Sequence, residues 1–368
     1  MNSPFSPPRK DAGQRVRVRT MLVDDSLVVR SILAAILAES DAIEVVASVP
    51  SADNALACLD RVTVDVIVLD LEMPGMNGIT ALPELIRKSG ARVLILSSNC
   101  EAGGPAAVRA LSLGAADTLA KPGQGSFSGG FGKIFAERIV ALSGGTRRHR
   151  PTGDPVAQRS DHKSAPTITH RPSRTPHCIL IGSSTGGIAA LNSFLKSLDD
   201  SVTAPILLTQ HLPAAFIPFF AMQLQGITRR IVLAAEDGMV LKSGHLYVAP
   251  GHAHLTVVRS GDGEARIALS KTPARNGCQP STDPMFASAA EVFGATAIAI
   301  VLSGMGHDGA EGARLIRARG GAVIAQSQDS CVVWGMPGSI VNAGLASAVL
   351  DPADASEYVN RAARRSAT

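Results

Sequence analysis

The chain has 368 residues, of which 45% are hydrophobic and 18% charged, a balance typical of a soluble globular protein of about two domains. No apolar run approaches the ~20 residues that a membrane span needs, so membrane insertion is not expected. The net charge of +4 lies largely in an N-terminal leader and a central segment, so nucleic-acid binding is not expected either. The five cysteines are scattered without a C-x-x-C pair, which favours a reducing cytoplasm and argues against a zinc site.

The N-terminal part of the chain alternates apolar strand-like runs with helical patterns, which predicts a parallel α/β sheet wound by helices. Residues 1–16 are proline-rich and basic and are expected to form a disordered leader. Ser26 is a good N-cap for the first helix, expected over residues 27–39. The expected strands cover residues 18–23, 43–47, 64–69, 93–96 and 118–120.

Polar residues follow these strands where ligands bind in an open parallel sheet. Three carboxylates that converge on one edge repel each other unless a cation lies among them, and oxygen ligands favour Mg²⁺. A nearby lysine and hydroxyl suit a phosphoryl group. The alternative, that an aspartate pair only caps the first helix, leaves the other strand ends unexplained. The residues are Asp24, Asp25, Asp70, Ser97 and Lys121.

Over residues 17–124 these features resemble the receiver domain of bacterial response regulators, which has a flavodoxin-like, doubly wound fold. The motifs are the Asp-Asp pair, the run Asp-Leu-Glu-Met-Pro-Gly-Met-Asn-Gly from residue 70, the serine, and Lys-Pro at 121–122. The resemblance implies that Asp70 accepts phosphate from a histidine kinase and that the Lys121-Pro122 bond is cis. Thr118 stands where receivers usually carry a switching aromatic. By resemblance, Mg²⁺ is held by Asp24, Asp25, Asp70 and the Glu72 carbonyl, Ser97 donates to the phosphoryl group, and Lys121 pairs with it.

A polar, proline-containing segment at residues 143–175 is predicted to be a basic flexible linker between two domains, the receiver over 17–142 and a second domain over 176–362. Such a linker could bind an acidic surface, although a solvated tether explains its composition equally simply.

The C-terminal part again alternates strands and helices, which predicts a second parallel-sheet α/β domain. Three of its apolar runs end in Ser184, His211 and Asp308, and the first breaks into Gly-Ser-Ser-Thr-Gly, the pattern of a nucleophile elbow. A serine needs an adjacent histidine as base and a carboxylate to orient it, so this set predicts acyl transfer. The chain order Ser, His, Asp differs from that of α/β-hydrolases. Amides near Met305 and Thr185 are candidates for the oxyanion hole.

Each of the three residues has an alternative role. The serine could belong to a phosphate-binding turn, the histidine could be a hydrogen-bonded strand-end residue, and the aspartate could cap the helix that starts near Gly309. Ser183 is the rival nucleophile.

The motifs Ile-Gly-Ser-Ser-Thr-Gly-Gly, Gln-His-Leu-Pro and Ser-Gly-Met-Gly-His-Asp-Gly, behind a receiver and a basic linker, are similar to the chemotaxis protein-glutamate methylesterase family. The resemblance covers residues 175–362 of the second domain. It implies hydrolysis of glutamyl methyl esters on chemoreceptors, deamidation of receptor glutamines, and a receiver that blocks the site until Asp70 is phosphorylated. It also implies a cytoplasmic enzyme, by default a monomer, that needs no metal for the ester chemistry.

Several smaller features accompany these motifs. His252 and His254 are a weak candidate metal pair, and His254 could instead line the cleft. Thr282 and Asp283 belong to a segment that resembles the family's substrate-side loop, while Met285 and Phe286 are expected in the core. Two departures from the family are Trp334, in place of a smaller aromatic, and Gly338, in place of a basic residue.

The sequence fits two other classes of function less well. A signalling module that only binds a partner has no reason to keep a complete serine, histidine and aspartate set. A DNA-binding response regulator would need a helix-turn-helix pattern after the linker, which the sequence lacks.

Overall fold

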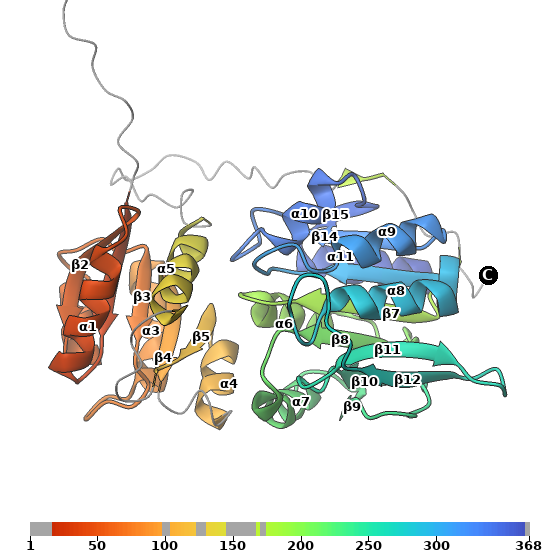
Figure 1. Cartoon of the computed structure of the whole chain (residues 1–368), viewed down its shortest axis with the longest axis horizontal. Coiled ribbons are helices and arrows are strands. Elements are labelled where there is room, and N and C mark those ends of the chain that lie inside the picture. Colours follow the sequence, from red (N-terminus) through yellow and green to blue (C-terminus); the bar gives the residue numbers. More distant parts are fainter. Residues whose placement is uncertain (1–16, 98–103, 123–129, 145–166, 170–173, 365–368) are drawn as a thin grey trace, which may run out of the picture.

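The computed structural model describes residues 17–97, 104–122, 130–144, 167–169 and 174–364, which form two α/β units (Figure 1). The N-terminal unit contains β1 to β5 and α1 to α5, and the C-terminal unit contains β6 to β15 and α6 to α11. The predicted leader and most of the predicted linker lie outside the described residues. No helix within the described ranges is long and apolar enough to cross a membrane.

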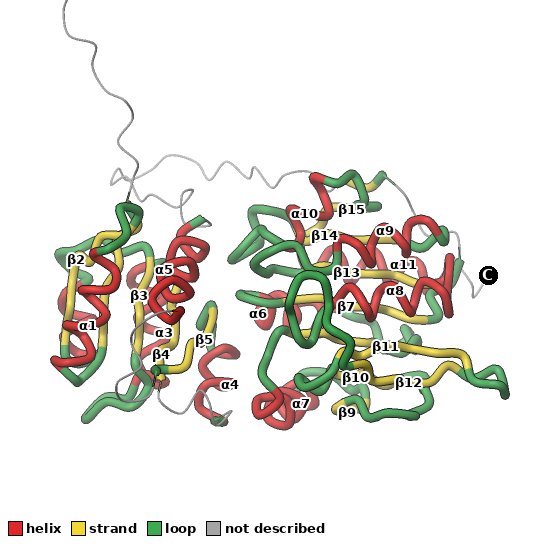
Figure 2. The backbone as a smooth tube through the Cα atoms, in the orientation of Figure 1, coloured by secondary structure: helices red, strands yellow, loops and turns green. Residues whose placement is uncertain are grey.

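The N-terminal unit is built on a five-stranded parallel sheet with the strand order β2-β1-β3-β4-β5 (Figure 2). The central strand β3 is buried along its whole length, as its continuous apolar sequence predicted. The Ser26 hydroxyl accepts a hydrogen bond from the Val29 amide and so caps α1 as expected. The strands are β1 (Val18–Val23), β2 (Ile43–Val49), β3 (Val66–Leu69), β4 (Arg92–Ser97) and β5 (Asp117–Ala120), and the helices are α1 (Leu27–Ala38), α2 (Ala52–Cys58), α3 (Gly78–Ser89), α4 (Pro105–Ser112) and α5 (Gly130–Ser143).

The C-terminal unit is built on an eight-stranded sheet with the order β6-β15-β14-β13-β7-β8-β10-β9. All its neighbouring strands are parallel except β6, which runs antiparallel to β15, so the predicted second α/β domain is confirmed. The strands are β6 (Thr167–Ile168), β7 (Cys178–Ser183), β8 (Ile206–Gln210), β9 (Ile231–Ala234), β10 (His245–Val248), β13 (Ala297–Val301), β14 (Ala322–Gln326) and β15 (Ala348–Leu350). Two residues of the predicted linker range, Thr167 and Ile168, thus belong to this sheet.

Helices cover the C-terminal sheet, and a separate hairpin, β11 (His254–Arg259) with β12 (Ala265–Ser270), packs beside α8. Met285 and Phe286 at the start of α8 are fully buried, as their apolar character predicted. The helices are α6 (Gly187–Ser197), α7 (Ile217–Gln225), α8 (Thr282–Phe293), α9 (Ala310–Ala318), α10 (Met336–Asn342) and α11 (Pro352–Arg364).

The strand order places three important loops side by side. Strands β13, β7 and β8 are direct neighbours, and because they are parallel, their carboxyl ends meet at one edge of the sheet. Ser184 follows β7, His211 follows β8, and Asp308 lies in the loop after β13. The topology alone therefore gathers these residues at one place.

The two units are in contact. Helix α4 packs against α6 and α7, and buried residues of both units, among them Val108 and Ile188, belong to one hydrophobic cluster. Val333, together with the half-buried Met305 and Val332, joins a cluster that includes Leu94 of β4. The N-terminal unit thus packs on segments that surround the strand ends described above.

One expectation about the backbone was wrong. The Lys121-Pro122 bond is not cis; the cis bond among the described residues joins Gln279 and Pro280.

Candidate active site and receiver site

The turn after β7 presents one serine and buries the other. Ser183 is fully buried, and its hydroxyl donates to the Gln210 side chain, whereas Ser184 is half-buried. The Ser184 amide donates to the Ser303 carbonyl at 3.0 Å, which ties the turn to the end of β13. A Cβ atom on Gly304 would lie 2.9 Å from the Ser184 Cβ, so only glycine allows this close approach. The geometry favours Ser184 over Ser183 as the exposed hydroxyl.

Asp308 is a buried carboxylate with five hydrogen-bond donors. It is 2% exposed, and its Oδ2 atom receives His211 Nε2 at 2.7 Å and the Thr282 amide at 2.6 Å. The other oxygen, Oδ1, receives Asn276 Nδ2 at 2.6 Å, the Ser281 hydroxyl at 2.7 Å and the Asp283 amide at 3.1 Å. The alternative helix-capping role is excluded, because α9 begins after Gly309 without a side-chain cap.

These contacts keep Asp308 ionised. Burial by itself raises the pKa of this carboxyl, but the hydrogen bond and charge of His211, with the Thr282 and Ser281 donors, bring the pKa below its usual range. Its neighbour Asp283 behaves in the opposite way, because burial and the nearby Asp308 charge raise its pKa to about 6. Asp308 is therefore a permanent negative charge beside the His211 ring.

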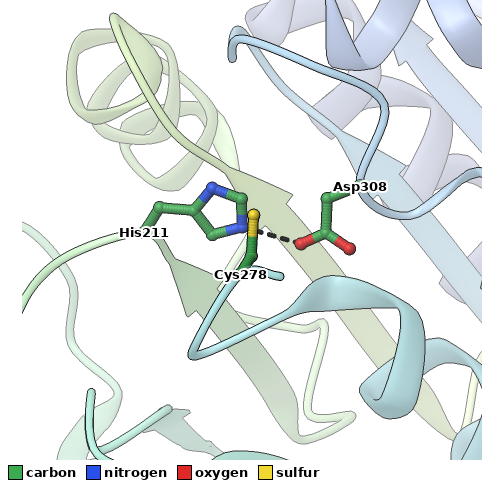
Figure 3. A group of neighbouring side chains, drawn as sticks. All are labelled: His211, Cys278 and Asp308. Carbon is green, nitrogen blue, oxygen red and sulfur yellow. Dashed lines mark hydrogen bonds and ion pairs between the residues drawn. The ribbon is translucent and has the colours of Figure 1, made fainter. Parts of the chain in front are cut away.

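His211 has one ring nitrogen left for chemistry. Nε2 is held by Asp308, so the ring is fixed with Nδ1 turned away from the carboxylate (Figure 3). Within the described residues no hydrogen bond joins the Ser184 hydroxyl to His211. Catalytic hydrogen bonds often form only when substrate is bound, so the absence of this bond is compatible with catalysis by the pair.

Two backbone amides near Ser184 are candidates for stabilising an oxyanion. The amides of Thr185 and Met305 make no hydrogen bond to any other described residue, whereas the Ser184 and Gly304 amides are occupied. Free donors at this position are what a tetrahedral intermediate requires.

Cys278 also lies at this site, and sequence reasoning missed it. Its sulfur points toward His211 and Asp308 (Figure 3), and burial, with the charges of Asp308 and Asp283, raises the pKa of its thiol. Asn276 and Ser281, which hold Asp308, were also missed, because they precede α8 and no spacing pattern links them to a residue so far along the chain.

His252 and His254 belong to no cluster of metal ligands among the described residues. His254 is buried and its Nδ1 accepts the Ser281 amide at 2.9 Å, so it supports the loop that holds Asp308. His252 is exposed, and its carbonyl accepts a hydrogen bond from Gln279.

The N-terminal unit contacts the residues that follow Ser184. The Thr185 hydroxyl donates to Asp117 Oδ2 at 2.6 Å, and Arg138 Nη1 contacts both the Asp117 carboxylate and Thr185 Oγ1. The Gly186 amide donates to the Ala116 carbonyl at 2.8 Å. We call Asp117, Arg138 and Thr185 the interdomain bridge.

The acidic cluster of the N-terminal unit is assembled as the sequence predicted. Carboxylate oxygens of Asp24, Asp25 and Asp70 lie within 4.8 Å of one another, and Asp24 and Asp70 are buried. Lys121 Nζ binds Asp24 Oδ2 at 2.7 Å and Asp70 Oδ2 at 2.6 Å, and the Glu72 amide donates to Asp70 at 3.2 Å. Three clustered carboxylates are a typical Mg²⁺ site.

The charges in this cluster oppose one another. Burial raises the pKa of Asp70 above its usual range, although the hydrogen bond and charge of Lys121 act in the opposite direction. Burial lowers the pKa of Lys121, but its bonds to the two carboxylates more than offset this and raise it. The Ser97 side chain lies outside the described part of the structure, and Ser97 itself ends β4.

Comparisons with known proteins cover both units. Residues 20–126 match the family described as response regulator receiver domain, and residues 179–359 match the family described as CheB methylesterase. A protein-glutamate methylesterase/protein-glutamine glutaminase of Rhodospirillum rubrum is 38% identical over 371 residues, which cover 95% of this chain and 96% of the relative. A relative of the same description in Caulobacter vibrioides is 40% identical over 354 residues, covering 94% of this chain and 99% of its own.

Among solved structures, the CheB methylesterase catalytic domain of Thermotoga maritima is 37% identical, with a TM-score of 0.49, and covers 50% of this chain and 97% of its own. The response regulator domain of the same organism's CheB is 29% identical, with a TM-score of 0.31, and covers 37% and 99%.

Proposed function

The chain belongs to the family of CheB-type response regulators, which join a receiver domain to a methylesterase domain, and we propose that Ser184, His211 and Asp308 carry out its hydrolysis. It is a protein-glutamate methylesterase and protein-glutamine glutaminase of chemotactic adaptation, regulated by its receiver domain. The observation that supports the assignment of residues best is the buried Asp308, held by five donors with His211 on one oxygen.

The reaction follows from this geometry. Ser184 Oγ attacks the ester carbonyl of a methylated glutamate while His211 Nδ1 takes the serine proton, because Nε2 is already bound to Asp308. The Thr185 and Met305 amides stabilise the oxyanion, each by about 3 kcal/mol. The intermediate collapses, and Nδ1 returns the proton to the departing methoxide, which releases methanol.

The second half repeats these steps with water. His211 takes a proton from water, the hydroxide attacks the glutamyl-serine ester, and Ser184 leaves with the proton. The products are a free glutamate side chain and the original enzyme. A glutamine follows the same course with ammonia as the leaving group. Apart from substrate and water, every group that takes part in these steps is a side chain or a backbone amide of this chain.

The substrates we propose are the cytoplasmic domains of chemoreceptors, and the phosphodonor is a chemotaxis histidine kinase. Phosphate would be transferred to Asp70, with Asp24, Asp25, Asp70 and the Glu72 carbonyl holding Mg²⁺ and Ser97 and Lys121 contacting the phosphoryl group. Bound Mg²⁺ would neutralise the negative charge that gathers there. We propose a cytoplasmic monomer divided near the predicted bounds, 17–142, 143–175 and 176–362, except that Thr167 and Ile168 of the linker range pair with the catalytic sheet.

Regulation is proposed to act through the interdomain bridge. Asp117 and Ala116 engage Thr185 and Gly186, the two residues that follow the nucleophile. In this arrangement the receiver lies against the elbow and hinders a receptor helix from reaching Ser184. Phosphorylation at Asp70 would weaken these contacts and open the site.

The test is methanol release from methylated receptor fragments by the purified full-length chain. Ser184→Ala and His211→Ala should each reduce kcat by at least about 10³-fold, while a matched serine control on an exposed turn, Ser201→Ala, should keep wild-type turnover. Asp70 phosphorylation should be intact in all three variants. Near-normal turnover in either active-site variant would remove the assignment.

A further inference from the structure

Three side chains of different chemistry meet beside the nucleophile. One ring nitrogen of His211, the sulfur of Cys278 and a carboxylate oxygen of Asp308 all lie within 4.8 Å of one another. Figure 3 shows the three side chains converging from separate segments: the loop after β8, the loop before α8 and the loop after β13. The sequence argued against a zinc site because the cysteines are scattered, but here the fold brings a single cysteine to two other ligands.

Imidazole, thiolate and carboxylate are the ligands that zinc takes in proteins, and three protein ligands leave a fourth position for water. We propose that His211, Cys278 and Asp308 form a zinc site whose occupation inhibits the esterase. Magnesium, which prefers oxygen ligands only, does not suit this set. The site is therefore distinct in its selectivity from the acidic cluster of the receiver.

The present geometry needs a small adjustment to hold the ion. Zinc would take the place of the proton between His211 Nε2 and Asp308 Oδ2, which are 2.7 Å apart. Bonds of about 2.0 to 2.3 Å require that this pair separate slightly and that the sulfur move closer. Cys278 lies on a loop next to Gly277, whose Cβ position faces open space, so the loop has room to shift.

The surrounding charges favour a cation. Asp308 and Asp283 both act electrostatically on the Cys278 thiol, more strongly than the opposing positive charge of Arg138. Asp308 is 2% exposed, so its charge is poorly screened by water. Among the described residues, the sulfur donates one weak hydrogen bond, to the Asn276 carbonyl at 4.0 Å. The negative charges of Asp308 and Asp283 would thus stabilise a divalent ion in place of the proton that His211 and Asp308 now share.

Inhibition follows from the proton balance. Zinc binding releases the thiol proton to solvent and moves the imidazole proton from Nε2 to Nδ1, so the ring no longer accepts a proton from Ser184. This consequence rests on the proposed role of His211 as the base, whereas the binding of zinc does not. The two can therefore be tested separately.

The experiment titrates the full-length chain with zinc chloride and measures methanol release relative to each variant's own metal-free rate. Cys278→Ser should raise the zinc concentration for half-inhibition by at least about tenfold, because loss of a direct ligand costs no less affinity than loss of an outer-shell partner. The matched control is Cys58→Ser, which removes the other half-buried thiol among the described residues and should be inhibited like the wild type. Equal inhibition of Cys278→Ser and wild type would overturn the site. Should Cys278→Ser not fold, Cys278→Ala serves in its place.

Cobalt(II) alone reports binding without activity. A thiolate-to-cobalt absorption band should appear in the wild type and in Cys58→Ser and be absent from Cys278→Ser. Its absence from the wild type would overturn the proposal. A band without inhibition would keep the metal site and contradict the role of His211 as base, so failure of the site and failure of the proposed function give different results.

Discussion

At the scale of single residues, the site depends on one buried charge. Asp308 has five donors and its pKa lies below the usual range, so it remains an anion wherever the enzyme is folded at ordinary pH. Because it binds Nε2, it decides which nitrogen of His211 is basic. The role of His211 is thus set by a neighbour that it contacts through a single hydrogen bond.

Replacing Asp308 by asparagine should reduce activity strongly. The amide keeps the shape, but its NH2 group faces donors on either side and can hold His211 in the wrong tautomer, and we expect kcat to fall by up to about 10⁴-fold. Measurement of kcat and KM separately checks this, with KM expected to change little. A variant that retains kcat would show that His211 is oriented by other groups.

Asp283 predicts a pH dependence of stability. Its pKa is about 6 in the folded protein, against 3.8 for an unperturbed aspartate, so the folded state binds this proton more tightly than the unfolded state. The stabilising effect of the bound proton is complete below pH ~4. That contribution is lost as pH rises through about 6. Thermal unfolding of Asp283→Asn should match wild type near pH ~4 and exceed it in Tm above pH ~7. A Tm difference that does not vary with pH would contradict this assignment.

Trp334 and Gly338, the two residues expected to depart from the family pattern, lie next to each other. Trp334 packs over Gly338, where an added Cβ would lie 3.0 Å from the indole ring. Gly338→Ala should therefore destabilise the protein by about 1 to 3 kcal/mol, and Trp334→Phe should reduce that loss when combined with it. Urea unfolding of the two single variants and the double variant measures the coupling. Strict additivity would mean that the contact has no energetic weight.

At the scale of elements, β5 connects the two functional sites. It begins with Asp117, which contacts Thr185 of the catalytic domain, and is followed directly by Lys121, which binds Asp70. A strand of four residues spans only about 13 Å, so Lys121 lies close to the interdomain bridge. Thr118 lies within the same strand.

Asp117→Asn should raise basal esterase activity without a phosphodonor. The substitution removes the charge that binds Arg138 and weakens the bond to Thr185, and a loss of about 1 to 2 kcal/mol in the closed arrangement corresponds to a 5- to 30-fold shift. Asp60→Asn is the matched control, because it breaks an exposed ion pair with Lys88 within the receiver. Equal basal rates in all three proteins would show that the bridge does not restrain the enzyme.

The sequence predicted most elements and offered Ser184, His211 and Asp308 as the candidate catalytic set, and the reason lies in their local signals. Buried parallel strands such as β3 and β7 are continuous apolar runs, and Ser184, His211 and Asp308 stand at the ends of such runs. Asn276, Cys278 and Ser281 come from an irregular loop, and their approach to Asp308 depends on how α8 packs. The contact of Asp117 with Thr185 depends on domain docking, for which a strand sequence carries no signal.

At the scale of the whole molecule, the resting arrangement couples two domains through a small set of polar contacts and a shared apolar cluster. Arg92 of the receiver is partly buried beside Cys331 of the catalytic domain, and burial lowers its pKa. Its buried Nε has no hydrogen-bond partner among the described residues. An interface that buries an incompletely paired cation is held less firmly than one that is fully satisfied. This suits a contact that has to open.

Phosphorylation should then open the interface in a metal-dependent way. With Mg²⁺ and a small phosphodonor, we expect methanol release to rise and the Gly186 amide, which donates to Ala116, to exchange its hydrogen faster. Removal of Mg²⁺ with a chelator, or Asp70→Asn, should abolish both effects. Faster exchange without greater activity would separate domain opening from access to Ser184.

The position of β5 in its sheet has a further consequence. It is the outermost strand of the receiver, and the catalytic domain covers the backbone next to it through Ala116. Unpaired strand edges invite pairing with other chains and favour aggregation. Separation of the domains would expose more of the backbone beside this edge strand. Variants that stay activated for long should therefore be more prone to precipitate.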